Sequence, residues 1–311
     1  MTILSPEDVA AAARRIAPHV RRTPLVASPL PGLWLVLENE QVSGAFKARG
    51  AFCALTALSP QQRSRGVVTH SSGNHGLALA RAAAALGCPA TVVVPSSAAP
   101  HKVAAVREAG ARVVVVPPEQ RAARAAAFVA DGLALVPPFD HDDVIAGQGT
   151  LGQQVLEQAA DAGITLGRIL APVGGGGLVS GIAVAVQGHE VGVVAVEPEL
   201  AGDLADSVAH GRHLAWPVQA TARTVADGLR LPSVGERPWE HIRALRVGVL
   251  TVSEEQILAA MRWLHDAGVR AEPSGAVAAA GGRLLAGGRV PGTVDVAVVS
   301  GGNVGPRLPW D

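Results

Sequence analysis

The chain has 311 residues, enough for about two domains. Hydrophobic residues make up 49% of it and the net charge is zero, so it can bury a core but offers no large basic surface for nucleic acid. Aromatic residues make up 3%, with no tyrosine, which argues against base-stacking platforms. We therefore expect a small neutral or zwitterionic ligand and no nucleic-acid partner.

The N-terminal segment 1–15 lacks the basic stretch and apolar core of a secretory signal. Cys53 and Cys88 form neither a C-x-x-C nor a metal-ligand pair, so we expect a reducing, cytoplasmic location. The most apolar stretch, residues 169–186, contains Pro172 and four consecutive glycines. A glycine loop exposed to lipid would leave backbone groups unpaired, so this stretch favours a strand, a loop and a helix over a membrane span.

The first helix is signalled close to the N-terminus. Ser5 can cap it, Pro6 suits its first turn, and Asp8 completes a capping box. From residue 66 to residue 140, continuous β-branched runs alternate with helical segments, a pattern typical of βαβ units in a parallel sheet. The expected strands are 66–71, 89–95, 111–117 and a short one within 133–140, and the expected helices are 74–87, 100–110 and 119–132.

The second half of the chain repeats this alternation. Ser253 and Gln256 form a second capping box. The expected strands are 167–174, 191–198 and 293–302, and the expected helices are 178–188, 253–268 and 273–287.

Two stretches rich in proline, serine or charge, 58–66 and 136–143, mark candidate domain boundaries. The predicted fold is α/β, with two domains whose parallel-type twisted sheets are flanked by helices. A small domain (67–140) is inserted into a large one (1–66 and 141–311).

Four glycines, Gly174 to Gly177, lie between an expected strand and an expected helix. They allow consecutive backbone N–H groups and a helix N-terminus to face one anion, which is the geometry of a phosphate cradle. The stretch lacks the nucleoside-triphosphate signature G-x-x-x-x-G-K-[ST] and fits a dinucleotide pattern poorly. A tight strand-to-helix turn is the competing interpretation, but one or two glycines would suffice for it.

Two further loops can face a ligand. In SSGNHG (71–76), Ser71 or Ser72 can cap a helix whose first N–H groups can receive a carboxylate, and Asn74 adds an amide. An ordinary helix cap explains this loop equally well. Ser300 follows the last expected strand, where side chains of parallel sheets face the ligand crevice, but a single serine is a weak signal.

Lys47 lies in SGAFKARGA (43–51), among small and apolar residues. A desolvated lysine loses part of its preference for the charged form, and its free amine can attack an aldehyde. Read alone, a lysine that reaches out to water is the simpler interpretation. A phosphate cradle, a carboxylate-binding helix start and an aldehyde-reactive lysine together match the needs of pyridoxal phosphate and an amino acid.

The motifs also resemble those of the fold-type II pyridoxal-phosphate enzymes, in the branch of threonine/serine dehydratases and serine racemases. They are RTPL (22–25), SGAFKARGA (43–51), SSGNHG (71–76), VIAGQGT (144–150), PVGGGGL (172–178), ADG (226–228), EPSGA (272–276) and SGGN (300–303). The resemblance covers nearly the whole chain. It implies a tryptophan synthase β-like fold with a large cofactor-binding domain and a small, mobile substrate domain.

By this resemblance, Lys47 binds the cofactor covalently, and Ser72 is the acid/base on the opposite face in racemase members. Phe46 packs near the cofactor ring, Asn74 bonds its hydroxyl and Ser300 meets its pyridine nitrogen. The implied cofactor-binding residues are Phe46, Lys47, Asn74, Gly174, Gly175, Gly176, Gly177, Leu178 and Ser300, and the implied substrate-binding residues are Ser71, Ser72, Asn74, His75 and Arg121.

The stretch EPELAGD (197–203) resembles the divalent-cation loop of racemase-like members. Glu197 and Asp203 would supply carboxylates and Ala201 a backbone carbonyl, hard ligands that suit Mg²⁺, Ca²⁺ or Mn²⁺. An acidic surface loop is the competing interpretation. Glu40, where the family usually has leucine, and Ala45, where it often has serine, depart from the pattern.

The function implied is that of a pyridoxal-phosphate-dependent ammonia-lyase (dehydratase). It would convert L-threonine and/or L-serine to a 2-oxo acid and ammonia by β-elimination. The alternatives are a serine/aspartate racemase, a 3-hydroxyaspartate dehydratase, and, from another class, a non-catalytic cofactor-binding protein. We also expect a homodimer and no membrane partner.

Overall fold

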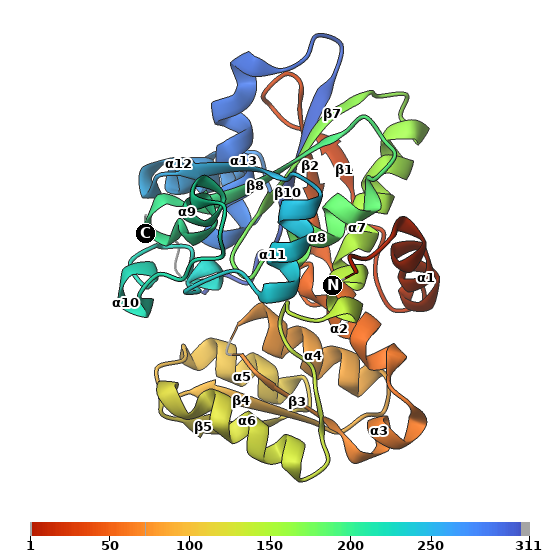
Figure 1. Ribbon diagram of the computed structural model, residues 1–311, viewed down its shortest axis with the longest axis vertical. Coiled ribbons are helices and arrows are strands. Elements are labelled where there is room, and N and C mark those ends of the chain that lie inside the picture. The colour runs from red at the N-terminus through yellow and green to blue at the C-terminus, as the bar shows by residue number, and fades with distance from the viewer. Residues whose placement is uncertain (1, 72, 306–311) are drawn as a thin grey trace.

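The strands form two separate sheets, with helices packed against both of them (Figure 1). A computed structural model of the chain describes residues 2–71 and 73–305. The larger sheet has the order β1-β2-β10-β7-β8-β9, and β1 is antiparallel to β2 whereas the other pairs are parallel. Its strands are β1 (Leu25–Ala27), β2 (Leu33–Leu37), β7 (Leu166–Pro172), β8 (Gly192–Pro198), β9 (Gly248–Val252) and β10 (Val294–Val299).

Side chains alternate between the two faces of the larger sheet, and both faces are buried. On β10, Val296 and Val298 pack with α7 (Asp142–Asp161) and α8 (Gly177–Ala185). Ala297 and Val299 pack on the opposite face with α12 (Glu254–Asp266) and α13 (Pro273–Leu284). Burial on both faces explains why the strands are continuous apolar runs.

The smaller sheet has four parallel strands in the order β5-β4-β3-β6. Helices α4 and α5 cover one face of it, where Leu77 packs on Val92, and α6 covers the other, where Phe128 packs near Val93. Its elements are β3 (Val67–His70), α4 (Asn74–Ala85), β4 (Ala90–Pro95), α5 (Pro100–Glu108), β5 (Arg112–Val116), η2 (Pro118–Gln120), α6 (Arg121–Ala130) and β6 (Ala134–Leu135).

Besides α7, the sequence pattern did not predict five other α-helices that the structure describes. They are α2 (Lys47–Ala57), α3 (Pro60–Arg65), α9 (Asp203–His210), α10 (Val218–Thr221) and α11 (Glu236–Ala244), with short 3-10 turns η1 (Glu38–Glu40), η3 (Glu199–Ala201), η4 (Asp227–Leu229) and η5 (Leu285–Gly288). The predicted capping boxes at the start of α1 (Pro6–Ile16) and of α12 are confirmed, with Ser5 accepting the Asp8 N–H and Ser253 accepting the Gln256 N–H. The stretch 58–66, read as a boundary, contains α3, which has a capping box of its own.

The predicted α/β class, with parallel-type sheets flanked by helices, is confirmed. All strands of the smaller sheet lie between residues 67 and 135, and the division into domains at 66/67 and 140/141 stays a prediction. Cys53 and Cys88 are both free and buried. No helix in the described part of the chain is both long enough and apolar enough to span a bilayer.

Candidate active site

The end of β10 meets the starts of α2 and α13. The Phe46 N–H donates to the Ser300 carbonyl at 3.0 Å, and the Glu272 N–H donates to the Gly301 carbonyl at 3.0 Å. Gly275 allows this approach, because a Cβ there would lie 2.1 Å from the Gly301 oxygen. The motifs around Lys47, Glu272 and Ser300 are therefore held together by backbone contacts.

Lys47 is the first residue of α2 and is only partly accessible to solvent. Its Nζ donates to the Pro138 carbonyl at 2.7 Å and lies 5.0 Å from the centre of the Phe46 ring. Burial lowers the pKa of the amine from 10.5 to about 8. A larger fraction of the lysine is thus in the nucleophilic form near neutral pH than for a solvated lysine.

Asn74, at the start of α4, is oriented by two partners that the sequence reading did not single out. Its Nδ2 donates to the Glu272 carboxylate, and its Oδ1 accepts from Asn303 Nδ2 at 2.8 Å. Asn303 also donates to the Ser43 carbonyl at 3.0 Å. Desolvation, reinforced by the charge of Asp227, raises the pKa of Glu272 from 4.5 to about 7. Both missed residues lie inside motifs already quoted, EPSGA and SGGN, so their positions were visible but their bonding was not.

Ser300 is buried behind the same region, and its hydroxyl lies 3.5 Å from the Ser274 carbonyl. The Ser274 hydroxyl accepts the Gly228 N–H at 2.9 Å. Gly228 in turn borders the glycine loop, since a Cβ on Gly174 would lie 3.5 Å from its carbonyl oxygen and 3.1 Å from Leu229 Cα. Ser300 is thus connected through Ser274 and Gly228 to the loop expected to hold a phosphate.

The glycine loop leads directly into α8 and has the geometry of an anion cradle. Gly176 has a left-handed φ of +84° and precedes the helix. The Ser180 N–H donates to the Gly176 carbonyl at 3.0 Å, whereas no acceptor is found among the described residues for the N–H groups of Gly177 and Leu178. A Cβ on Gly175 would lie 2.1 Å from the Phe139 ring. These free donors and the absence of side chains fit a phosphate group.

Phe139, which the sequence reading did not single out, links the loop to the lysine. Its ring lies against Gly175, and its neighbour Pro138 accepts the bond from Lys47. The residues present therefore fit pyridoxal phosphate: an amine for its aldehyde, a cradle for its phosphate, and Asn74 and Ser300 for its polar ring atoms.

The expected substrate residues are placed in different ways. The Ser71 hydroxyl accepts the Gly73 N–H at 3.4 Å, and Ser72 lies outside the described residues. The His75 ring is buried with Nε2 3.0 Å from the Val136 carbonyl, and burial lowers its pKa to about 3, so the ring is neutral. The start of α4, rather than this ring, is the part of the motif suited to an anion.

Arg121 begins α6, on the side of the smaller sheet where β3 ends. Its Nε donates to the Pro118 carbonyl at 3.0 Å. Its charge helps burial to lower the pKa of His70, the last residue of β3. Arg121 therefore lies on the same edge of the sheet as the SSGNHG loop.

In the expected cation loop, the two carboxylates accept hydrogen bonds from backbone N–H groups. Glu197 accepts the N–H groups of Leu204 and Ala205 at 3.3 and 2.6 Å, and Asp203 accepts the Val234 N–H at 3.0 Å. Burial is the main cause that raises the pKa of Glu197 to about 8 and of Asp203 to about 7. Residues 2–71 and 73–305 contain no cluster of three His, Cys, Asp or Glu side chains that could hold a metal. The expected site at Glu197, Ala201 and Asp203 is not supported.

Comparisons with known proteins show the family to which the chain belongs. The family model of the pyridoxal-phosphate dependent enzyme matches residues 16–302. The L-threo-3-hydroxyaspartate ammonia-lyase of Saccharomyces cerevisiae is 37% identical, with 96% of this chain and 92% of that protein covered, and the serine racemase of Arabidopsis thaliana is 36% identical over the same shares.

The solved structure of a threonine deaminase from T.th. superposes with a TM-score of 0.91 at 43% identity. The superposition covers 98% of this chain and 100% of that chain. The match of the family model spans nearly all the motifs that build the site, from RTPL through the glycine loop to the start of SGGN. This chain belongs to the pyridoxal-phosphate dependent enzymes of fold type II, the family that includes ammonia-lyases and racemases of amino acids.

Proposed function

We propose that this chain is an ammonia-lyase that converts L-threonine and/or L-serine to a 2-oxo acid and ammonia. The observation that carries the proposal is the half-buried Lys47, whose amine has a pKa of about 8 and lies in the same site as Asn74, Ser300 and the glycine loop. The 43% identity with a threonine deaminase supports the choice of substrate.

The cofactor, when bound, supplies an electron-withdrawing ring that acidifies the Cα proton of an amino acid. The chain supplies the remaining functions. The Lys47 amine would hold the cofactor, and its lowered pKa suits it to accept the Cα proton of the substrate. The start of α4 binds the substrate carboxylate, and Asn74 is kept in one orientation by Glu272 and Asn303.

The Ser300 hydroxyl would hydrogen-bond the ring nitrogen of the cofactor but would not hold it protonated as a carboxylate would. A serine in this position would favour loss of the β-hydroxyl from the substrate. Elimination is therefore the reaction that the site supports best.

The direct test is a substrate panel with chiral analysis of the products. We expect 2-oxo acid and ammonia from L-threonine or L-serine, and we expect Lys47→Ala to lose both activity and covalently held cofactor. Cofactor still covalently attached in Lys47→Ala would overturn the assignment of the lysine. Cofactor uptake without any product would identify a non-catalytic binding protein.

A second candidate is activity on an acidic substrate, as a 3-hydroxyaspartate dehydratase or a serine/aspartate racemase. The position of Arg121, close enough to the end of β3 to affect the pKa of His70, favours it, because a guanidinium there can pair with a second carboxylate. The 37% identity with a hydroxyaspartate ammonia-lyase supports it as well. In the panel, L-threo-3-hydroxyaspartate consumed faster than threonine and serine, or D-amino acid as the main product, would select this candidate. The homodimer and the cytoplasmic location remain predictions.

A further inference from the structure

A buried ion pair lies on the side of α2 opposite Lys47. Arg49 Nε donates to Glu38 Oε2 at 2.9 Å, and Arg49 Nη2 donates to Glu38 Oε1 at 2.7 Å. Only 3% of the arginine side chain and 0% of the glutamate side chain are exposed. Lys47 and Arg49 are two residues apart in one helical turn, so their side chains leave the helix about 200° apart. The lysine thus contacts Pro138 while the arginine points into the protein.

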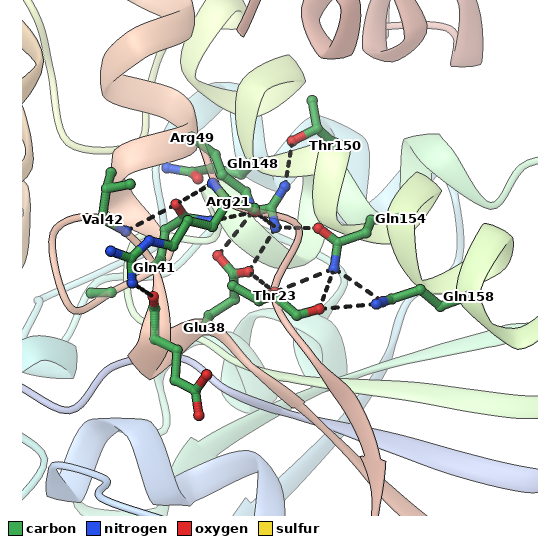
Figure 2. A network of polar contacts seen from close by, with 12 residues as sticks. Arg21, Thr23, Glu38, Gln41, Val42, Arg49, Gln148, Thr150, Gln154 and Gln158 are labelled. Carbon is green, nitrogen blue, oxygen red and sulfur yellow. Dashed lines mark hydrogen bonds and ion pairs between the residues drawn. The ribbon is translucent and has the colours of Figure 1, made fainter. Parts of the chain in front are cut away.

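The same guanidinium ties α2 to the long helix α7. Arg49 Nη1 donates to Thr150 Oγ1 at 3.2 Å, and Nη2 donates to Gln154 Oε1 at 2.7 Å. Thr23 completes the group, since its hydroxyl donates to Glu38 Oε1 at 2.6 Å. Figure 2 shows these side chains converging on Arg49 from the chain before β1, from η1 and from α7.

Helix α2 has no side-chain cap of its own, because Phe46 occupies the N-cap position. Gln148 of α7 binds the first turn of α2 from outside, and its Oε1 accepts the Gly50 N–H at 3.2 Å. The two helices are in direct backbone contact here, since a Cβ on Gly147 would lie 2.7 Å from the Arg49 carbonyl oxygen. The start of α2 is therefore fixed from outside the helix, by α7 and Glu38.

Buried ion pairs are expensive to desolvate, and neutral replacements of similar volume are often as stable. A charged pair beneath the turn that carries the reactive lysine is thus poorly explained by stability alone. We propose that Glu38 and Arg49 are positioning residues that hold the first turn of α2, and with it the Lys47 amine, against Pro138. The inference deepens the proposed function and rests on it only in taking Lys47 as the reactive group.

The test measures the ionisation of Lys47 in the full-length chain freed of cofactor. Lys47 and Lys102 are the only two lysines in the sequence, so acylation by acetic anhydride can be followed for each by mass spectrometry as a function of pH. The midpoint for wild-type Lys47 should lie at about 8. His75 is the titratable group in electrostatic contact with Lys47, and with a pKa of about 3 it stays neutral throughout.

The informative variant is Glu38→Gln/Arg49→Gln, which removes both charges together so that neither charge is left buried alone. We expect its melting temperature to change little, whereas the Lys47 midpoint should rise by about one pH unit or more, a tenfold change, as water reaches a loosened first turn. Lys102 should be unaffected. If this variant does not fold, Glu38→Leu/Arg49→Met is measured in the same way.

A matched control neutralises another bidentate ion pair, that of Arg168 with Asp295. Asp295 lies at the end of β10 that is opposite to Ser300. Asp295→Asn/Arg168→Gln should leave the Lys47 midpoint at about 8. An unchanged midpoint in the Glu38/Arg49 variants would overturn the inference and leave the pair with a structural role only. A failure of the proposed function can be told apart from a failure of this inference. In that case the wild-type protein would make no product, whereas the comparison of the Lys47 midpoints would still hold.

Discussion

Lys102 and Asp227 form an ion pair that joins the two halves of the molecule. Lys102 lies in the first turn of α5, beside the smaller sheet, and Asp227 begins η4, beside the glycine loop of the larger one. Both charges also act on Glu272, the partner of Asn74. The pair therefore connects the smaller sheet to the polar groups around the site.

Removing this pair should weaken substrate binding more than stability. Its side chains are partly exposed, at 21% and 40%, so Lys102→Met should lower the melting temperature by at most about 3 °C. Loss of the pair would loosen the contact between α5 and the polar groups around Glu272, and at about 1 kcal/mol we expect KM to rise about fivefold. Lys102→Arg, which keeps the cation, is the control. Unchanged kinetics in Lys102→Met would show that the pair does not contribute to substrate binding.

The buried carboxyl of Glu272 predicts a pH dependence of stability with an unusual sign. Its pKa rises from 4.5 to about 7 on folding, so the native state holds its proton more tightly than the unfolded chain does. Stability should consequently fall as the pH rises from about 4.5 through 7, with a contribution of at most about 3 kcal/mol.

The measurement is thermal unfolding at a series of pH values, for wild type and for Glu272→Gln. Glu197 and Asp203 add slopes of the same sign, because their pKa values are also raised. The glutamine variant should therefore show a shallower slope than wild type, not a flat one. Identical slopes for the two proteins would mean that folding does not raise the pKa of Glu272.

Gly275→Ala should destabilise the fold by about 1–3 kcal/mol, the usual cost of overpacking. The new Cβ would lie 2.1 Å from the Gly301 carbonyl oxygen, and this backbone cannot move without displacing Ser300. Gly287→Ala is the matched control, because a Cβ there meets nothing within 4 Å. Urea unfolding of both variants tests the expectation, and equal midpoints would contradict it.

The regular part of the fold was predictable because its signals are local. The capping residues Ser5 and Ser253 and the β-branched strands identify their elements without knowledge of the partners. Helix α7 was missed because Gly147 and Gly149 look like loop residues. They are required by close crossings, since a Cβ on Gly149 would lie 2.6 Å from the Gly181 carbonyl oxygen.

The residues of the candidate site also fall into two groups, those with a local sequence signal and those without one. The glycine loop, Lys47 and Asn74 were found because each belongs to a recognisable local motif. The pairing of Glu38 with Arg49 and of Asn74 with Glu272 depends on contacts across 11 and 198 positions of the chain. Spacing in a single sequence does not reveal such contacts, so these partners became visible only in the folded molecule.

The short crossover that follows β6 has a mechanical consequence. Val136 accepts the bond from His75 of α4, Pro138 accepts the bond from Lys47, and Phe139 lies against Gly175. Any displacement of the smaller sheet would therefore reach both Lys47 and the glycine loop through the four residues 136–139. Because one short segment contacts both Lys47 and Gly175, a change in the position of the smaller sheet should alter the surroundings of the amine and of the glycine loop together.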